Sequence, residues 1–345
     1  MSTTFKLPCA PNEIDAFLAR PTPGVLETLA RQTGDVMVSG AGGKMGPTLC
    51  LMLVEALKQI KSSAKVLAVS RFSSAESRQL LESVGVKTIP CDLLDRQAVA
   101  ALPDAPNILF LAGQKFGTTE GPELTWAMNT IVPANVAERF PKSRIVAFST
   151  GCVYSFTNVL QGGSTETSPT EPTGDYPNSC VGREQIFTYF SKKNKTPVSI
   201  YRLNYAIDFR YGVLVDVAQK VMKQEPVDVT MGHVNLIWQG DACARAIQCL
   251  DIAESPARPI NITGPETIAV RALAEIFGKA FGIKPQITGK EAEYLWLNNA
   301  SQSFSLFGYP SVSTDEMIRW VAAWILDGGK TLNKPTHFEV RDGRF

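Results

Sequence analysis

The chain has 345 residues, with 34 Lys and Arg against 33 Asp and Glu, and is 44% hydrophobic, a composition typical of folded globular proteins and not of disordered ones. A net charge of +1 creates no long-range field that would attract nucleic acid or an anionic membrane, and no apolar run reaches the ~18–20 residues that a membrane-spanning helix needs. The opening MSTTFKLPCA lacks the apolar core of a secretory signal, so we expect a cytoplasmic protein.

Histidine and cysteine usage limits the kinds of site that this chain can build. Only two histidines are present, His233 and His337, so a site with several histidine ligands is excluded and we expect no metal. The seven cysteines are odd in number and include no C-x-x-C pair. We therefore expect reduced thiols, most of them acting as small apolar residues of the interior.

The first two-thirds of the chain alternate between apolar strands and helices. An N-terminal arm, 1–33, holds two short helices at 12–18 and 25–32, and a nucleotide-binding domain follows at 34–204. Its expected strands are 35–39, 65–69, 88–90, 108–111, 144–148 and 198–203. Its expected helices are 47–60, 75–84, 96–101, 124–140 and 182–192. This alternation predicts an α/β fold with a Rossmann-like, doubly wound parallel sheet.

Residues 205–345 mix shorter elements, and we expect most of them to form a smaller substrate-binding lobe. Helices are expected at 213–223, 241–252, 270–281 and 314–325. A strand at 259–262 returns to the parallel sheet. The polar tail, 335–345, is consistent with either a docked segment or a frayed terminus.

A glycine-rich turn follows the first expected strand and leads directly into a helix. Gly40 would make the tight turn, Gly43 would let the backbone approach a pyrophosphate, and Gly46 would let helix and strand pack closely. Because strand, turn and helix occur in this order, the turn predicts a dinucleotide site. The expected cofactor-binding residues of this turn are Gly40, Gly42, Gly43, Lys44, Met45 and Gly46.

The second expected strand ends in Val69-Ser70-Arg71 and lacks the acidic residue that hydrogen-bonds the adenosine ribose in NAD-binding folds. Ser70 does not repel a 2′-phosphate, and Arg71 can pair with one through two N–H donors. The sequence therefore favours NADP over NAD. In the other interpretation, Arg71 stacks on the adenine or faces solvent.

Several short motifs accompany the glycine turn. They are Cys91-Asp92-Leu93, Leu111-Ala112-Gly113-Gln114-Lys115, Asn129 and Ser149-Thr150-Gly151-Cys152-Val153-Tyr154. Together with the turn they resemble the extended short-chain dehydrogenases, the NAD-dependent epimerase/dehydratase family, over about residues 34–330.

The resemblance implies a role for each of these motifs. Asp92 would contact the adenine, with Leu93 beside it, and Ala112-Gly113 would border the cofactor. Lys115 would lie near the pyrophosphate and ribose, unless it is a solvated surface lysine. Asn129 would help to hold the active-site loop.

The same resemblance implies a Ser/Thr–Tyr–Lys catalytic group. In such a group the tyrosine moves a proton to or from the substrate oxygen, the hydroxyl residue positions that oxygen, and the lysine binds ribose and lowers the tyrosine pKa. Thr150 stands at the hydroxyl position and Tyr176 at the tyrosine position, where Tyr176 would also contact the cofactor. Glu184 follows at the spacing the family pattern requires, but the lysine position holds Cys180.

The replacement of the lysine leaves three interpretations open. Without a nearby cation Tyr176 would keep a phenol pKa near ~10 and be a poor base at neutral pH. Either Lys115 or Arg183 substitutes for the missing charge, or the chemistry depends less on tyrosine ionisation and Cys180 or another group assists, or the protein binds nucleotide without turnover. For Cys180 alone, the favoured interpretation is a simple packing residue, since a catalytic Cys180 would need its pKa lowered by a positive charge.

The substrate half is less familiar. Arg202-Leu203-Asn204-Tyr205 resembles the family segment whose asparagine contacts the substrate. Where members that use sugar nucleotides have an arginine that grips the diphosphate, this chain has Val234, so a nucleoside-diphosphate sugar is not expected. The expected substrate-binding residues are Thr150, Asn204, Asn235, Trp238 and Gln239. The alternative for the last four is polar loop residues and a core tryptophan, and His233 is either a substrate contact or a turn residue.

The sequence thus predicts an NAD(P)-dependent oxidoreductase or epimerase that acts on a hydroxyl or carbonyl carbon of a sugar, sugar acid or similar polyol. Thr150 would orient the substrate oxygen, Tyr176 would pass the proton, and Lys115 would supply the missing charge. The alternative is a dinucleotide-binding sensor with weakened catalysis. The resemblance implies a homodimer, and we expect no nucleic-acid or membrane partner.

Overall fold

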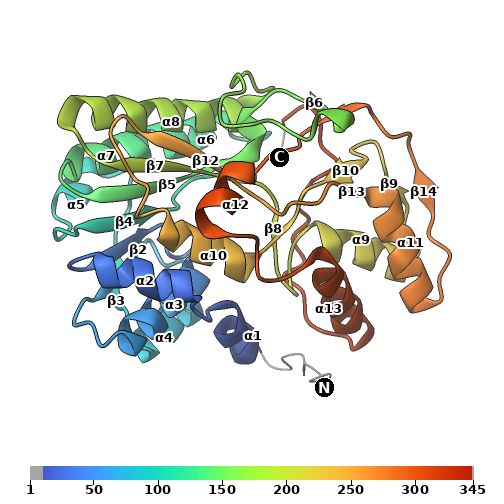
Figure 1. The fold of residues 1–345 in the computed structure, drawn as a ribbon, viewed down its shortest axis with the longest axis horizontal. Coiled ribbons are helices and arrows are strands. Elements are labelled where there is room, and N and C mark those ends of the chain that lie inside the picture. The colour runs from blue at the N-terminus through green and yellow to red at the C-terminus, as the bar shows by residue number, and fades with distance from the viewer. Residues whose placement is uncertain (1–10, 344–345) are drawn as a thin grey trace.

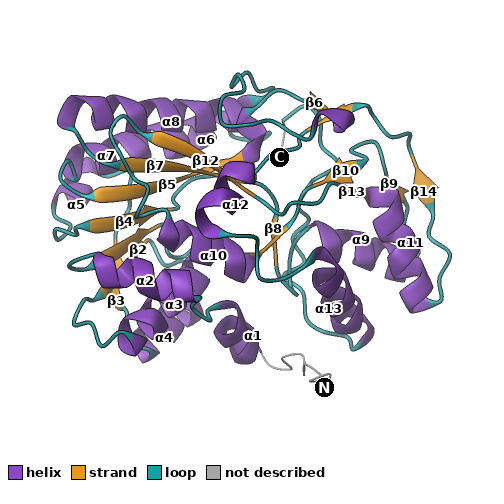
Figure 2. Cartoon of the chain, in the orientation of Figure 1, coloured by secondary structure: helices purple, strands orange, loops and turns teal. Residues whose placement is uncertain are grey.

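Seven parallel strands form the central sheet, in the order β12-β7-β5-β4-β1-β2-β3 (Figures 1 and 2). The computed structural model describes residues 11–343. The strands of this sheet are β1 (Val36–Ser39), β2 (Val66–Ser70), β3 (Lys87–Pro90), β4 (Asn107–Phe110), β5 (Arg144–Thr150), β7 (Val198–Leu203) and β12 (Arg258–Ile262). The order reverses between β1 and β4, which is where doubly wound sheets open a ligand crevice at their carboxyl ends.

Helices cover both faces of the sheet, and each face has its own apolar core. One layer contains α2 (Pro23–Arg31), α3 (Gly46–Gln59) and α10 (Gln239–Gln248). The other contains α5 (Arg96–Ala100), α6 (Pro122–Trp126), α7 (Val132–Arg139) and α8 (Asp175–Asn194). The remaining helices of this half are α1 (Pro11–Leu18) and α4 (Ala75–Ser83). The predicted Rossmann-like, doubly wound α/β fold is confirmed.

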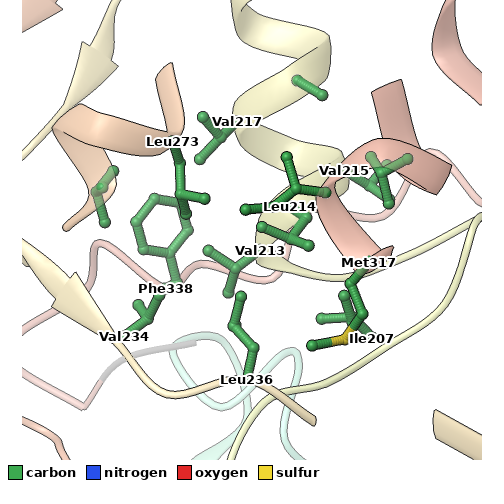
Figure 3. Close-up of a cluster of buried hydrophobic side chains, with 14 of the residues drawn as sticks. Ile207, Val213, Leu214, Val215, Val217, Val234, Leu236, Leu273, Met317 and Phe338 are labelled. Carbon is green, nitrogen blue, oxygen red and sulfur yellow. The ribbon is translucent and has the colours of Figure 1, made fainter. Parts of the chain in front are cut away.

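A smaller lobe follows the sheet and packs around a third apolar core (Figures 1 and 3). Its helices are α9 (Val213–Met222), α11 (Val270–Phe281) and α13 (Thr314–Leu326), whereas α12 (Ser301–Phe307) packs against β12 of the central sheet. Its short strands, with β6 from the preceding loop, are β6 (Thr157–Asn158), β8 (Ala206–Ile207), β9 (Val227–Asp228), β10 (His233–Val234), β11 (Ile237–Trp238), β13 (Ile268–Ala269), β14 (Ile287–Thr288) and β15 (Tyr294–Leu295). These strands pair two by two and do not extend the central sheet.

Two differences from the expected elements affect the site, and the structure also decides between the two alternatives for the tail. Helix α8 begins at Asp175, seven residues before the expected start, because Pro177 lies in the first turn, where its missing N–H has no intrahelical partner anyway. The expected helix at 124–140 is interrupted by a π-helical turn, Ala127–Ile131, immediately before Pro133 enters α7. The tail is docked, with Phe338 only 1% exposed.

Membrane-spanning helices, metal ligands and cysteines are the three features that the composition brought into question. Within residues 11–343, no helix combines the length and apolar character needed to cross a bilayer, and no cluster of three or more potential ligands could hold a metal. The six cysteines in this range are free and buried, whereas Cys9 and the opening segment lie outside the described residues.

Candidate active site

The glycine turn has the geometry that close approach of a ligand requires. Gly40 has a φ of +89°, and a Cβ there would come within 2.6 Å of the Ala112 backbone nitrogen. Gly46 packs so closely on the Ala41 carbonyl that a side chain would clash with it. Gly43 is exposed, and the nearest atom to a Cβ built on it would be the Gly40 carbonyl oxygen, at 3.3 Å. The turn therefore packs tightly against the rest of the protein at Gly40 and Gly46, and its backbone is exposed at Gly43.

Two adjoining cavities lie along the carboxyl ends of the strands and share the glycine turn. The first, of about 210 Å³, is bounded by the ends of β2 and β3 and by the loop after β4. Arg71 is exposed at its rim, as is Asp92. The predicted cofactor residues in its wall are Gly40, Gly42, Gly43, Ser70, Arg71, Asp92, Leu93, Ala112 and Gly113.

The second cavity, of about 320 Å³, is lined by three of the four predicted catalytic residues, whereas the fourth, Cys180, is fully buried and does not line it. The predicted site residues in its wall are Gly40, Gly43, Lys44, Met45, Lys115, Thr150, Tyr176 and Asn204. Cys152, Tyr205, Tyr211 and Thr336 also line it, and none of these four was a predicted site residue. Tyr205 and Tyr211 follow β7, so the rule that residues after parallel strands line the site could have identified them.

Tyr176 lies in the first turn of α8 and faces Thr150, the last residue of β5. The Thr150 hydroxyl hydrogen-bonds Tyr176, and Tyr176 in turn hydrogen-bonds Cys180 one helical turn further on. Burial raises the pKa of Tyr176 well above its usual value, and the Arg183 charge and the Thr150 hydrogen bond oppose that rise. Burial also raises the pKa of the Cys180 thiol to about 11, so this residue is neutral at physiological pH.

Arg183 lies on the same face of α8 as Tyr176 and Cys180, since seven residues span almost two full turns. Its Nη1 donates to the Phe148 carbonyl at 2.8 Å, and its Nη2 donates to Asn129 Oδ1. The guanidinium also lies against Gly113, where it leaves no room for a Cβ. The Arg183 cation is thus buried behind the residues that line the site, one helical turn beyond position 180, where the family has its lysine.

Asn129 connects the active-site loop to this cation. Its Nδ2 donates to the Gln114 carbonyl and to Ser179 Oγ, both at 2.9 Å, and its Oδ1 accepts from the Gln114 backbone N–H at 2.9 Å. Asn129 is fully buried and does not line either cavity. It holds the loop that carries Gly113 and Lys115, as the resemblance implied, and it reaches the cofactor region only through that loop.

Two lysines face the second cavity. Lys115 is half-buried, and its Nζ donates to the Thr336 carbonyl at 3.1 Å. Lys44 Nζ donates to the Ala206 carbonyl at 3.2 Å and lies 4.0 Å from the centroid of the Tyr211 ring. Burial lowers the pKa of both lysines, that of Lys44 to about 8. Lys115 is therefore in the wall of the cavity and is not a solvated surface residue.

A buried ion pair fixes the position of α8. The Glu184 carboxylate accepts from Arg202 Nη2 at 2.6 Å and Nε at 2.9 Å, and it also accepts from Ser149 Oγ at 2.5 Å. Arg202 Nη1 donates to the Tyr154 hydroxyl at 2.7 Å, which donates to Asn261 Oδ1 at 2.7 Å. These contacts join α8 to β5, β7 and β12.

Comparison with known proteins agrees with this geometry. The model of the NAD dependent epimerase/dehydratase family matches residues 36–207. The chain belongs to this family. It has the framework of an NAD-dependent epimerase/dehydratase-like enzyme. No match was found among curated protein sequences.

Solved structures show that the fold of this family extends over most of the chain. A UDP-glucose 4-epimerase from Thermotoga maritima, solved with UDP-glucose, has a TM-score of 0.70 at 15% identity, covering 85% of this chain and 99% of that chain. A dTDP-glucose 4,6-dehydratase from Streptomyces venezuelae, solved with NAD, has a TM-score of 0.72 at 18% identity, covering 85% and 97%. A mutant UDP-glucuronic acid 4-epimerase from Bacillus cereus has a TM-score of 0.71 at 17% identity, covering 85% and 99%.

The structure corrects three of the expected substrate residues of this family protein. Asn235 is buried, where its Nδ2 donates to the Glu266 carbonyl at 3.0 Å and its Oδ1 accepts from the Asn298 N–H at 2.9 Å. Trp238 packs in an aromatic cluster, 5.2 Å from the Trp320 ring centroid. Gln239 is fully buried, and its Nε2 donates to Thr48 Oγ1 at 2.9 Å. Asn235 and Trp238 stabilise the lobe, Gln239 joins α10 to α3, and none of the three lines the second cavity.

Replacing Arg202 by Met should lower the free energy of unfolding by about 3–5 kcal/mol, because the Glu184 carboxylate would stay buried without its partner. The double variant Glu184→Leu/Arg202→Met should be more stable than Arg202→Met alone, since it buries no unpaired charge. Urea unfolding followed by circular dichroism measures both changes.

The matched control is Arg96→Met, which removes an exposed pair with Glu138 and should change stability little. If Arg202→Met were no more destabilising than Arg96→Met, the Glu184–Arg202 pair would not be what holds α8 in place.

Proposed function

We propose that this protein oxidises, reduces or epimerises a hydroxyl- or carbonyl-bearing carbon of a sugar, sugar acid or similar polyol, using NAD or NADP. The supporting observation is that Thr150, Tyr176 and the glycine turn all line the second cavity, while the first cavity adjoins it and reaches Ser70 and Arg71. Catalysis at Tyr176 then requires a nicotinamide ring in the second cavity and a substrate oxygen beside the phenol.

The residues present fit a dinucleotide. Gly43 and Gly113 are exposed in the cavity walls, where their backbones can be approached closely, and the turn leads directly into the N-terminus of α3, where backbone N–H groups favour a pyrophosphate. Gly40, Gly42, Gly43 and Met45 would hold the phosphates and ribose. When bound, the nicotinamide would exchange a hydride with the substrate carbon.

The proton chemistry belongs to Thr150 and Tyr176. Thr150 would hydrogen-bond the substrate oxygen and orient it, and Tyr176 would take the hydroxyl proton in oxidation or donate one in reduction. Arg183 would replace part of the positive charge of the missing lysine, because its charge opposes the rise in the Tyr176 pKa. Lys115 would add positive charge from the cavity wall, whereas Cys180, a neutral thiol, would act only as a hydrogen-bonding partner of Tyr176.

Two features favour a substrate without a nucleoside diphosphate and a cofactor with a 2′-phosphate. Val234, at the position of the family arginine, is 1% exposed within an apolar core and offers nothing that would bind a diphosphate. Arg71 lies exposed at the rim of the first cavity beside Ser70, where it can pair with the 2′-phosphate of NADP.

A homodimer in the cytoplasm completes the proposal. Exposed apolar side chains gather on the outer side of the α6–α7 segment and on α8, and these are Leu124, Trp126, Ile131 and Tyr189. Such a face is suited to pairing with a second copy of the chain.

The competing function is a dinucleotide sensor with little turnover. The observations that favour it are the neutral Cys180 at the lysine position and the raised pKa of Tyr176. Both functions require the nucleotide site, so the presence of bound dinucleotide in the purified protein does not separate them, but its reduction by a substrate does.

Incubating the protein with NAD or NADP and a panel of sugars, sugar acids and polyols should produce reduced cofactor, followed by absorbance at 340 nm, or an epimer detected by chromatography. Tyr176→Phe should lower turnover by a factor of ~10²–10⁴, because the proton carrier is lost. Tyr189→Phe, which changes an exposed tyrosine of the same helix, should leave turnover unchanged. Full activity in Tyr176→Phe would exclude the catalytic assignment, and no turnover with any compound would favour the sensor.

The rate of oxidation should rise with pH through the alkaline range, since Tyr176 acts as a base only after losing its proton and burial raises its pKa. Arg183→Met removes a charge that favours the phenolate, so the rise should move to higher pH by about one unit. Arg144→Met is the control, because Arg144 donates to the Leu250 and Ala253 carbonyls at the other end of β5. An identical pH profile in the Arg183 and Arg144 variants would refute the electrostatic role.

Arg71→Ala should weaken NADPH binding ~10–100-fold, because a charge-assisted pair with the 2′-phosphate is lost. NADH binding should change less than threefold, roughly, since NAD has no such phosphate. Fluorescence titration measures both, with Arg78→Ala on α4, which pairs with Glu82, as the control. Equal weakening of both cofactors would remove the reason to favour NADP.

A further inference from the structure

The segment 331–343 crosses from the lobe to the sheet at the second cavity. It starts beside α9 and α13, where the Leu332 N–H donates to the Arg210 carbonyl at 2.9 Å. It ends against the loop before α8, where Gly343 packs so closely on Gly174 that neither position has room for a Cβ. Between these ends the segment contacts both halves of the molecule.

Phe338 anchors the segment in the core of the lobe. Its side chain is 1% exposed and belongs to the same apolar cluster as Val234 and Leu273. Figure 3 shows its ring between these two residues. The space beside Val234 is therefore filled from within the chain by an aromatic ring.

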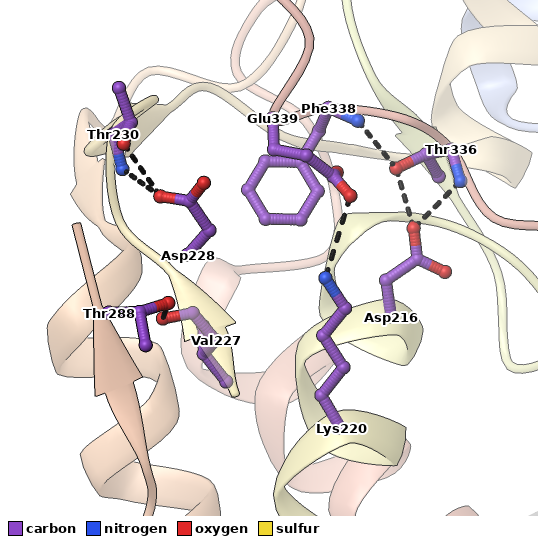
Figure 4. Close-up of polar contacts among 9 residues, drawn as sticks. All are labelled: Asp216, Lys220, Val227, Asp228, Thr230, Thr288, Thr336, Phe338 and Glu339. Atoms are coloured by element: carbon purple, nitrogen blue, oxygen red, sulfur yellow. Dashed lines mark hydrogen bonds and ion pairs between the residues drawn. The ribbon is translucent and has the colours of Figure 1, made fainter. Parts of the chain in front are cut away.

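A turn at Thr336 is held by Asp216 of α9 (Figure 4). The backbone N–H and the hydroxyl of Thr336 both donate to Asp216 Oδ2, at 2.8 and 2.6 Å. The Phe338 N–H donates to Thr336 Oγ1 at 3.3 Å. Because all of these contacts lie on one side of the turn, they fix the direction in which the Thr336 carbonyl points.

That carbonyl accepts from Lys115 Nζ at 3.1 Å, and both residues line the second cavity. The next residues along each segment also lie close together, since the ring centroids of Phe116 and His337 are 6.0 Å apart. A lysine of the sheet half is thus held in the cavity wall by a segment that belongs to the lobe.

The ionisable side chains in the wall of this cavity have one sign of charge. Among the described residues that line it, the charged ones are Lys44 and Lys115, and none is a carboxylate. Burial lowers the pKa of Lys115, and Asp216 and Glu339, which lie behind the wall, partly offset that fall. A cavity whose only ionised lining groups are cations is complementary to an anion.

We propose that residues 331–343 are a built-in wall of the substrate site, in which Thr336 positions Lys115 to bind the carboxylate of a sugar acid. This inference rests on the proposed function and narrows its substrate class from sugars and polyols in general to acidic ones. Phe338 limits that site to a substrate without a nucleotide, because its ring occupies the space next to Val234. Lys115 is then a substrate-binding residue, and Thr336 is a positioning residue that acts through it.

The first experiment compares substrates. Aldonic and uronic acids should be turned over with a kcat/KM at least tenfold above that of the corresponding neutral aldoses and alditols. Lys115→Met should raise KM for the acids at least tenfold more than KM for the neutral compounds, whereas the loss of its charge near Tyr176 should lower kcat for both groups by a similar factor. Equal kcat/KM for acids and neutral compounds in the wild-type protein would overturn the inference but leave the proposed function intact.

The second experiment needs no substrate, and so it stays informative if no compound in the panel reacts. Reductive methylation of folded protein with formaldehyde, followed by peptide mass spectrometry, measures how accessible Lys115 is. Phe338→Ala and the milder Thr336→Val should each raise its methylation rate at least threefold by loosening the carbonyl contact. Phe277→Ala, which removes another fully buried phenylalanine from the same core, should not.

The two experiments fail separately. If Phe338→Ala does not remain folded, Thr336→Val decides the outcome, since it deletes one hydroxyl and no part of the core. Methylation rates equal to those of Phe277→Ala would show that the segment is merely structural. With a reactive acid in hand, Thr336→Val should also raise KM with kcat and cofactor affinity unchanged, which a general loss of stability would not do.

Discussion

The buried pair of Glu184 and Arg202 is the interaction on which the site depends. Helix α8 carries Tyr176, Cys180 and Arg183 along one side, and its distance from β5 is set by Glu184, which binds Ser149 and Arg202 together. An ion pair in the interior is tolerated only when its remaining donors and acceptors are satisfied. The hydroxyls of Ser149 and Tyr154 meet that condition, so the pair fixes the helix relative to three strands at once.

Placing the cation one turn further along α8 changes what it can do. A lysine at position 180 would point into the site and could bind ribose directly, whereas Arg183 donates its hydrogen bonds to Phe148 and Asn129. It therefore influences Tyr176 only through space, and its planar group reinforces the floor below Gly113. Under the proposed mechanism, Arg183 would keep the electrostatic task of the family lysine and leave the binding of ribose to other residues.

The parts that the sequence predicts are those with local causes. The parallel sheet follows from alternating apolar strands and helices, and the turn at Gly40 follows from residues within one short stretch. The sequence places the start of helix α8 too late because Pro177 looks like a helix breaker. In the structure Pro177 lies in the first turn, where a proline does not disrupt a helix. Thr336 could not be predicted, because it lines the cavity through a backbone carbonyl. For Asn235 and Gln239 the sequence left a substrate contact and a structural role both open, because buried amides and ligand-binding amides are the same residue types and only their neighbours in the fold distinguish them.

The two halves of the molecule are interleaved along the chain. Strand β12 and helix α10 complete the central sheet and one of its faces, yet both come after β8, α9 and the first strands of the lobe. The stretch 36–207 that the family model matches would therefore leave the edge of β7 without its partner and the apolar surface under α10 uncovered. The sheet is finished by contacts that are distant in sequence, which is the kind of topology that folds slowly. Nucleotide and substrate regions are consequently one cooperative unit, and no single cut in the chain would yield either of them alone.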